Sequence, residues 1–207
     1  MSRPLLPFLA AALLLLACSD TTEVEVLGED GTLVERYTIR KADSTRHGPA
    51  TAYDQDGVLM EESVYVDGEL EGLRKRYYPD GTLQAEETLV AGKLQGPYRS
   101  YYPNGQVEVE SQYVDHSIEG MLTAYYRDGA KKEEVTMASS MAVGPFTEWH
   151  PNGELKAEGQ YVRGGKEQGE LLLYDERGEL ERKMDCDVGL CRTTWPAELV
   201  KQVANEH

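Results

Sequence analysis

The stretch GLRKRYYPDG at residues 72–81 decides the fold, because its pattern returns 24 residues later as GPYRSYYPNG at residues 96–105. A fixed period of this length is typical of repeat architectures. Two glycine series keep the register and predict a tandem array of 24-residue units. The first series is Gly31, Gly57, Gly81, Gly105, Gly129, Gly153 and Gly178, and the second is Gly48, Gly72, Gly96, Gly120, Gly144 and Gly169.

Each unit is predicted to be one β-hairpin. Aspartate or asparagine precedes six of the seven glycines in the first series. Asp-Gly and Asn-Gly favour type I′ turns, because both central residues of such a turn have positive φ. Hairpins stacked side by side bury one face of the sheet. The predicted fold is therefore all-β, an elongated antiparallel meander of tandem hairpin repeats that ends in a short C-terminal capping helix.

Columns of equivalent residues follow from the period. An aromatic column stands five residues after each glycine of the second series, and we expect it to form a buried structural ladder: Tyr53, Tyr77, Tyr101, Tyr125, Trp149 and Tyr174. Another column stands two residues after each turn glycine: Leu59, Leu83, Val107, Lys131, Leu155 and Leu180. Six residues further on lie Tyr65, Leu89, Tyr113, Met137 and Tyr161. An even spacing predicts that these last two columns share one face of the sheet.

An acidic column is predicted on the opposite face. It comprises Glu62, Glu86, Glu110, Glu134 and Glu158, each at an odd spacing from the Leu59 column. Equivalent carboxylates two strands apart are about 9.5–10 Å from one another, too far to share a proton or a metal ion. The column is either a solvated face with modest salt bridges or a binding stripe for a basic protein or cationic polymer.

The recurring motifs YYPDG, YYPNG and WHPNG resemble the MORN-repeat variant of bacteria, over about residues 24–184. That resemblance implies a β-hairpin meander with a binding or scaffold role and no catalytic residues; proteins with this variant are often labelled antitoxins. Two departures stand out. His116 and Ser140 replace a loop glycine, and residues 137–142 lack the usual tyrosine and charge. This segment is either a degenerate repeat or the place where a partner binds.

The first seventeen residues are of a different kind. Arg3 precedes an apolar run that is too short to span a bilayer as a helix but suits a secretory signal peptide. The run ends in LLAC at residues 15–18, which resembles the lipobox of bacterial lipoproteins and implies lipidation of Cys18. An ordinary signal peptide is the alternative. Because Ser19 follows the cysteine, the resemblance favours the outer membrane of a Gram-negative envelope over retention at the inner one.

Cys186 and Cys191 are the remaining cysteines. In an exported protein we expect them to form a short-range disulfide, with free thiols as the alternative. Thr193, Pro196 and the apolar residues of 199–203 predict a short helix that covers the last hairpin, with Trp195 as its anchor. The expected organisation is a signal peptide (1–17), a lipid-anchored linker (18–23), the repeat array (24–184) and a C-terminal cap (185–207).

The composition and the absence of catalytic motifs argue against several classes of function. The net charge of −16 argues against nucleic acid and against a basic patch on anionic lipid. The histidines are scattered, no nucleophile elbow or phosphate-binding loop occurs, and no cofactor or metal site is expected. We expect a non-catalytic protein, bound to the membrane through its N-terminal lipid, that binds a protein or another envelope component. An immunity lipoprotein that neutralises a toxin and a purely structural envelope protein are the alternatives.

Overall fold

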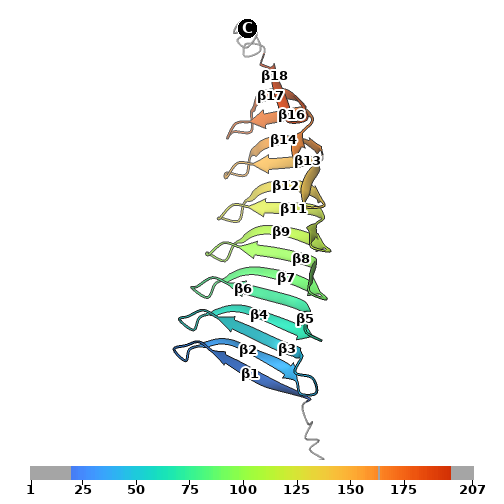
Figure 1. Ribbon diagram of the computed structural model, residues 1–207. Coiled ribbons are helices and arrows are strands. Elements are labelled where there is room, and N and C mark those ends of the chain that lie inside the picture. The colour runs from blue at the N-terminus through green and yellow to red at the C-terminus, as the bar shows by residue number, and fades with distance from the viewer. Residues whose placement is uncertain (1–19, 163, 197–207) are drawn as a thin grey trace, which may run out of the picture.

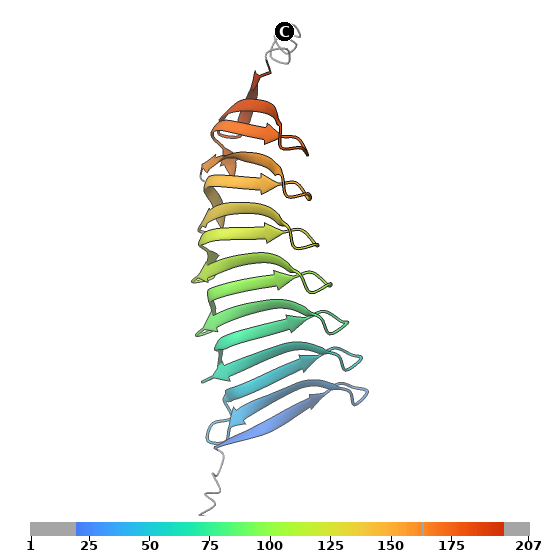
Figure 2. The ribbon, with the colours of Figure 1, turned by 180° about the vertical axis from the view of Figure 1, so that it is seen from behind.

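The computed structural model describes residues 20–162 and 164–196, and within them the chain forms one long, open, antiparallel sheet (Figures 1 and 2). Successive hairpins lie side by side in chain order, so β1 and β18 are its two edges, at opposite ends of the array. The strands are β1 (Thr21–Leu27), β2 (Leu33–Arg40), β3 (Arg46–Tyr53), β4 (Leu59–Val66), β5 (Glu69–Leu70), β6 (Gly72–Tyr77), β7 (Leu83–Val90), β8 (Lys93–Tyr101), β9 (Val107–Val114), β10 (Ser117–Ile118), β11 (Gly120–Tyr125), β12 (Lys131–Ala138), β13 (Met141–Trp149), β14 (Leu155–Val162), β15 (Lys166–Glu167), β16 (Gly169–Tyr174), β17 (Leu180–Asp187) and β18 (Leu190–Trp195).

The predicted β-hairpin meander is confirmed, but the predicted capping helix is not supported. Thr193 and Trp195, expected at the start of that helix, belong to β18, which extends the sheet beyond β17. The remainder of the expected helix and Cys18 lie outside the described residues. The sheet also begins at Thr21, inside the segment expected to be a linker. Among the described residues no helix is long and apolar enough to cross a membrane.

The predicted type I′ geometry at the Asp-Gly and Asn-Gly turns is wrong. In the turn at Tyr78–Thr82, only Gly81 has positive φ (83°), and the Tyr78 N–H donates to the Thr82 carbonyl. This is a type I turn followed by a bulge glycine, and Pro79 and Asp80 suit its central positions. The type I′ geometry occurs instead at the other loop, where Ala91 (φ 48°) and Gly92 (φ 73°) are both left-handed. His116 and Ser140 adopt the same conformation without glycine.

A β-bulge in each repeat overturns the predicted assignment of faces. Tyr53 stands opposite Leu59 and Ala52 opposite Glu61, so Met60 is an extra residue. The same shift recurs after Leu83, Val107, Lys131, Leu155 and Leu180. One extra residue inverts the alternation of side chains. The Leu59 column therefore lies on the face of the glutamates, and the Tyr65 column lies on the other face.

The buried residues all lie on that other face, here called the core face. They are Ala50, Ser63, Ala85, Glu87, Leu89, Val135, Phe146, Ala157 and Cys186. Two aromatic pairs pack on it: the Phe146 and Tyr161 rings stack with centroids 4.2 Å apart, and Tyr98 meets Tyr113 edge-on. The predicted aromatic ladder at Tyr53 to Tyr174 lies on the opposite face and is only half-buried.

Glu87 is a charged residue buried on the core face, with 3% of its surface exposed. Its carboxylate lies 2.9 Å from Arg74 and 2.9 Å from Arg76, both on the neighbouring strand β6. A buried carboxylate is tolerated only when such partners compensate its lost hydration. The core face is therefore held by an ionic cluster in its N-terminal half and by an apolar cluster around Phe146 further along the array.

A candidate binding face on the open sheet

The opposite face of the sheet, here called the groove face, carries the predicted acidic column. Glu62, Glu86, Glu110 and Glu158 each accept a hydrogen bond from the tyrosine of the following repeat, at 2.6–2.8 Å. The donors are Tyr77, Tyr101, Tyr125 and Tyr174. Trp149 replaces the tyrosine after Glu134, and there Lys131 binds Glu134 and lies over the indole ring. The aromatic and acidic columns, predicted on opposite faces, are thus one ladder of inter-repeat contacts.

These contacts change how the groups ionise. The hydrogen bond from Tyr125, together with Arg99, lowers the pKa of Glu110, so this carboxylate stays ionised in mildly acidic solution. Burial and the neighbouring Glu62 raise the pKa of Tyr77 to about 12. The hydrogen bond to Glu158 likewise raises the pKa of Tyr174 to about 12. Tyr77 and Tyr174 therefore remain neutral phenols at neutral pH and donate their hydroxyl hydrogens to Glu62 and Glu158.

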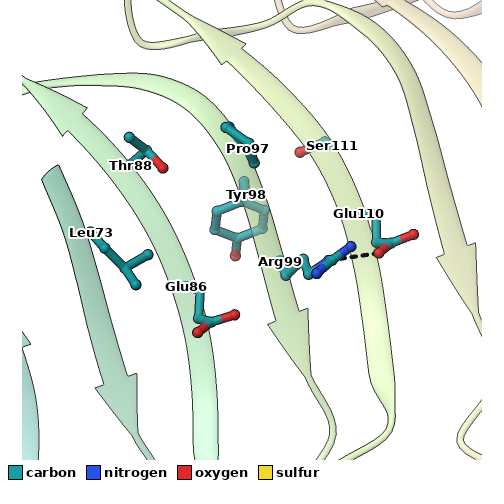
Figure 3. A pocket seen from close by; sticks show the side chains of 8 residues that line it. All are labelled: Leu73, Glu86, Thr88, Pro97, Tyr98, Arg99, Glu110 and Ser111. Carbon is teal, nitrogen blue, oxygen red and sulfur yellow. Dashed lines mark hydrogen bonds and ion pairs between the residues drawn. The ribbon is translucent and has the colours of Figure 1, made fainter.

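Shallow grooves cross this face. One of about 190 Å³ lies over Glu23, Arg36 and Thr51 near the β1 edge, and three others share one set of lining positions. The groove beside Pro97 has a volume of about 360 Å³ (Figure 3). It is lined by Leu73, Glu86, Thr88, Pro97, Arg99 and Glu110 of this face, and also by Tyr98 and Ser111, which alternate with them along β8 and β9. The second groove, of about 270 Å³, contains Pro49, Thr51 and Glu62. The third, of about 460 Å³, contains Pro145, Thr147 and Glu158. Corresponding lining residues of these three grooves are separated by 48 residues, so the three lie at every second repeat.

The Gly-Pro pairs explain why the grooves occur at alternate repeats. Pro97 lacks the N–H of a ladder residue, and the pairing of β7 with β8 shifts register beside it, between Glu87 and Leu89. Gly96 (φ 109°) allows a close approach at this point, since a Cβ there would lie 3.3 Å from the Cβ of Thr88. Gly48-Pro49 and Gly144-Pro145 repeat the arrangement, whereas Leu73 and Met121 follow the intervening glycines and are exposed.

The structure places only part of the predicted acidic binding stripe at the three grooves. Glu62, Glu110 and Glu158 line the three grooves, and Glu86 joins them at the Pro97 groove, but Glu134 lines none of the three. The prolines and the exposed Leu73 were not singled out from the sequence. The signal that could have found them is the Gly-Pro pair, which recurs every 48 residues within the 24-residue period.

Other predicted sites lie elsewhere. Cys186 and Cys191 stand opposite one another on β17 and β18 with their sulfur atoms at disulfide distance, 2.03 Å. Residues 137–142 form the end of β12, a loop and the start of β13, and Ser140 accepts a hydrogen bond from the Ile118 N–H. Within residues 20–162 and 164–196, no cluster of three or more His, Cys, Asp or Glu side chains could hold a metal ion.

The fold and the groove face define a repeat protein, an open sheet of hairpins in which each unit contacts its neighbours. Residues 46–67, 70–90, 94–115 and 142–163 match the family model described as MORN repeat variant. These four segments are therefore similar to MORN-variant repeats, which agrees with the resemblance of the turn motifs. Residues 118–138 form the same kind of hairpin between the third and fourth matched segments. No curated protein matches the chain significantly.

Proposed function

We propose that this protein is a non-catalytic, lipid-anchored repeat protein whose groove face binds a protein segment rich in basic side chains. The observation that carries the proposal is the recurrence of one groove three times on an open face, with a proline, a Thr or Arg and a glutamate at each. A protein with a net charge of −16 also attracts a basic partner at long range.

The spacing of the grooves favours an extended partner. Equivalent grooves are four strands apart, about 19 Å at the usual distance between strands. A segment that occupies all three grooves therefore reaches across roughly 40 Å of sheet, about twelve residues of extended chain. Its basic side chains meet Glu62, Glu110 and Glu158, while its apolar groups contact Leu73 and the prolines.

The contacts already made by these carboxylates support the proposal. A tyrosine hydroxyl holds each groove glutamate in place, so binding does not have to immobilise a free side chain. Arg99, which is 55% exposed, is the competing cation at Glu110. A basic partner that displaces Arg99 replaces the exposed Arg99–Glu110 ion pair with its own ion pair to Glu110. Because the two ion pairs are similar in energy, this contact contributes to the specificity of binding more than to its affinity.

Capture of a partner from an envelope extract tests this function. We expect the wild-type protein to retain a discrete partner and the triple variant E62Q/E110Q/E158Q to lose it. The matched control E29Q/E69Q/E134Q changes the net charge equally but leaves the grooves intact, and should retain the partner. Equal retention by both variants would contradict the groove assignment. A toxic protein as partner would make the chain an immunity lipoprotein, and the lack of any discrete partner would favour a structural role.

Lipid attachment is tested separately. Labelling with radioactive palmitate should mark the wild-type protein but not the C18A variant, which should also leave the membrane fraction. An unlabelled wild-type protein would remove the anchor from the proposal and leave the binding face unaffected.

A further inference from the structure

The two edge strands of the sheet run in the same direction. Fourteen successive antiparallel pairings connect β1 to β18, and an even number of reversals restores the original direction. When the sheet of one copy continues antiparallel into the sheet of a second copy, with both core faces on the same side, it must therefore join like edges. Either β1 pairs with β1 or β18 pairs with β18. Pairing of like edges is two-fold symmetric and closes after two copies.

The β1 edge is protected against such pairing. Glu23 and Glu25 are two residues apart on one face of this short strand. Both carboxylates bind the single Arg36 of β2, which neutralises only one of the two charges. Antiparallel pairing of β1 with itself brings the carboxylates of two copies opposite or next to one another, and like charges across a strand pair are destabilising. Charged side chains on an edge strand are a common defence against unwanted association.

The β18 edge lacks this protection. Its one charged residue is Arg192, and the apolar side chains of Leu190 and Trp195 are 78% and 43% exposed. Cys186 and Cys191 have Cα atoms 4.0 Å apart, the spacing of a non-hydrogen-bonded pair, so the N–H and C=O of Cys191 point away from β17. By alternation, those of Thr193 do so as well.

We propose that the β18 edge is a self-association site at which a second copy of this chain pairs antiparallel. The two-fold axis that relates the copies passes near Cys191 or Thr193, and the outward backbone groups of that residue form hydrogen bonds with the same groups of the second copy. An axis at Arg192 is disfavoured, because it would place the guanidinium groups of both copies next to each other. Pairing covers Leu190 and Trp195 and extends the core face through both copies. This proposal is independent of the groove partner.

Site-specific photocross-linking of the purified full-length protein tests the site. With p-benzoylphenylalanine in place of Thr193, irradiation should produce a species of about twice 23.1 kDa. The same photoreactive residue in place of Thr22 on β1 is the matched control and should not. A cross-link from position 193 only to residues 197–207 of the same chain, or to a different protein, would overturn the proposal.

Sedimentation provides a second readout that does not depend on the cross-linker. Thr193→Pro removes an outward N–H that β17 does not use, so the protein stays folded while its dimer dissociation constant rises at least tenfold. Leu27→Pro on the other edge is the control: by the alternation set by the Lys41 N–H to Asp20 bond, it also removes an N–H that points away from the neighbouring strand, and it should leave dimerisation unchanged. A protein that is monomeric at every concentration, or one that dimerises only after deletion of residues 197–207, would contradict the proposal, because that tail would then be the occupant of the edge.

Discussion

Tyr101 donates its phenolic hydrogen to the carboxylate of Glu86 across 2.8 Å, and so bonds one repeat to the repeat before it. The same relation joins Tyr77 to Glu62 and Tyr125 to Glu110. Because repeat arrays are stabilised mainly by contacts between neighbouring units, these bonds contribute directly to the cooperativity of the sheet.

Removal of this hydroxyl should weaken the array. Tyr101→Phe keeps the ring and leaves Glu86 without its donor, which we expect to lower the unfolding free energy by about 1–2 kcal/mol. Urea unfolding followed by circular dichroism measures the change. Tyr53→Phe is the matched control, because Arg36 stands where the preceding glutamate would be and no hydroxyl bond is lost. Equal effects of the two substitutions would contradict the ladder.

Glu87 should be indispensable to the core face. Glu87→Gln leaves Arg74 and Arg76 without their counter-ion. The expected cost is about 2–3 kcal/mol, below the roughly 3–5 kcal/mol of a fully buried pair, because both arginines remain partly exposed. Chemical denaturation measures it, and Glu29→Gln at an exposed turn should change little. A Glu87→Gln protein as stable as the wild type would show that the ion pairs of Glu87 with Arg74 and Arg76 do not stabilise the fold.

The two turn types seen in the structure lead to opposite predictions for two glycine substitutions. Ala91→Gly relieves a left-handed alanine and should stabilise the protein by about 0.5 kcal/mol after the added entropy of the unfolded chain. Asp80→Gly should instead destabilise it by about 1 kcal/mol, because Asp80 has negative φ and its carboxylate accepts the Thr82 N–H. The melting temperatures of both variants test this prediction. A lower melting temperature for Ala91→Gly together with a higher one for Asp80→Gly would instead favour a type I′ turn at Asp80-Gly81.

The tyrosines predict a loss of stability in alkali. Burial raises the pKa of Tyr161 to about 12, and the pKa values of Tyr77 and Tyr174 are also about 12. A tyrosine whose folded pKa exceeds the value of about 10 in unfolded chains contributes stability that is fully present below pH 10. That contribution is lost as the pH rises towards 12.

Tyrosinate absorbance and circular dichroism, measured together from pH 9 to pH 13, should therefore change in parallel above about pH 10. Tyr161→Phe removes one of these groups and should move the alkaline transition to higher pH. Complete ionisation of the tyrosines below pH 11 in a sheet that stays intact would contradict this prediction.

Much of the fold could be predicted because it rests on local chemistry. The glycines, the Asp-Gly and Asn-Gly pairs and the tyrosines recur at one period, and local turn preference is enough to define hairpins and their order. The assignment of faces could not be predicted in this way. It depends on the extra residue at positions such as Met60 and Gln84, and a bulge is fixed by pairing across strands rather than by the residues beside it.

The sequence by itself determined the 24-residue repeat, the meander and the column of glutamates at Glu62 to Glu158. Only the tertiary structure decided that these glutamates share a face with the tyrosines, that Pro49, Pro97 and Pro145 lie at grooves beside three of them, and that β18 forms an edge of the described sheet. The physical reason is that a repeat unit specifies its own turns, whereas the faces, grooves and edges of the sheet arise from the hydrogen-bond register between units.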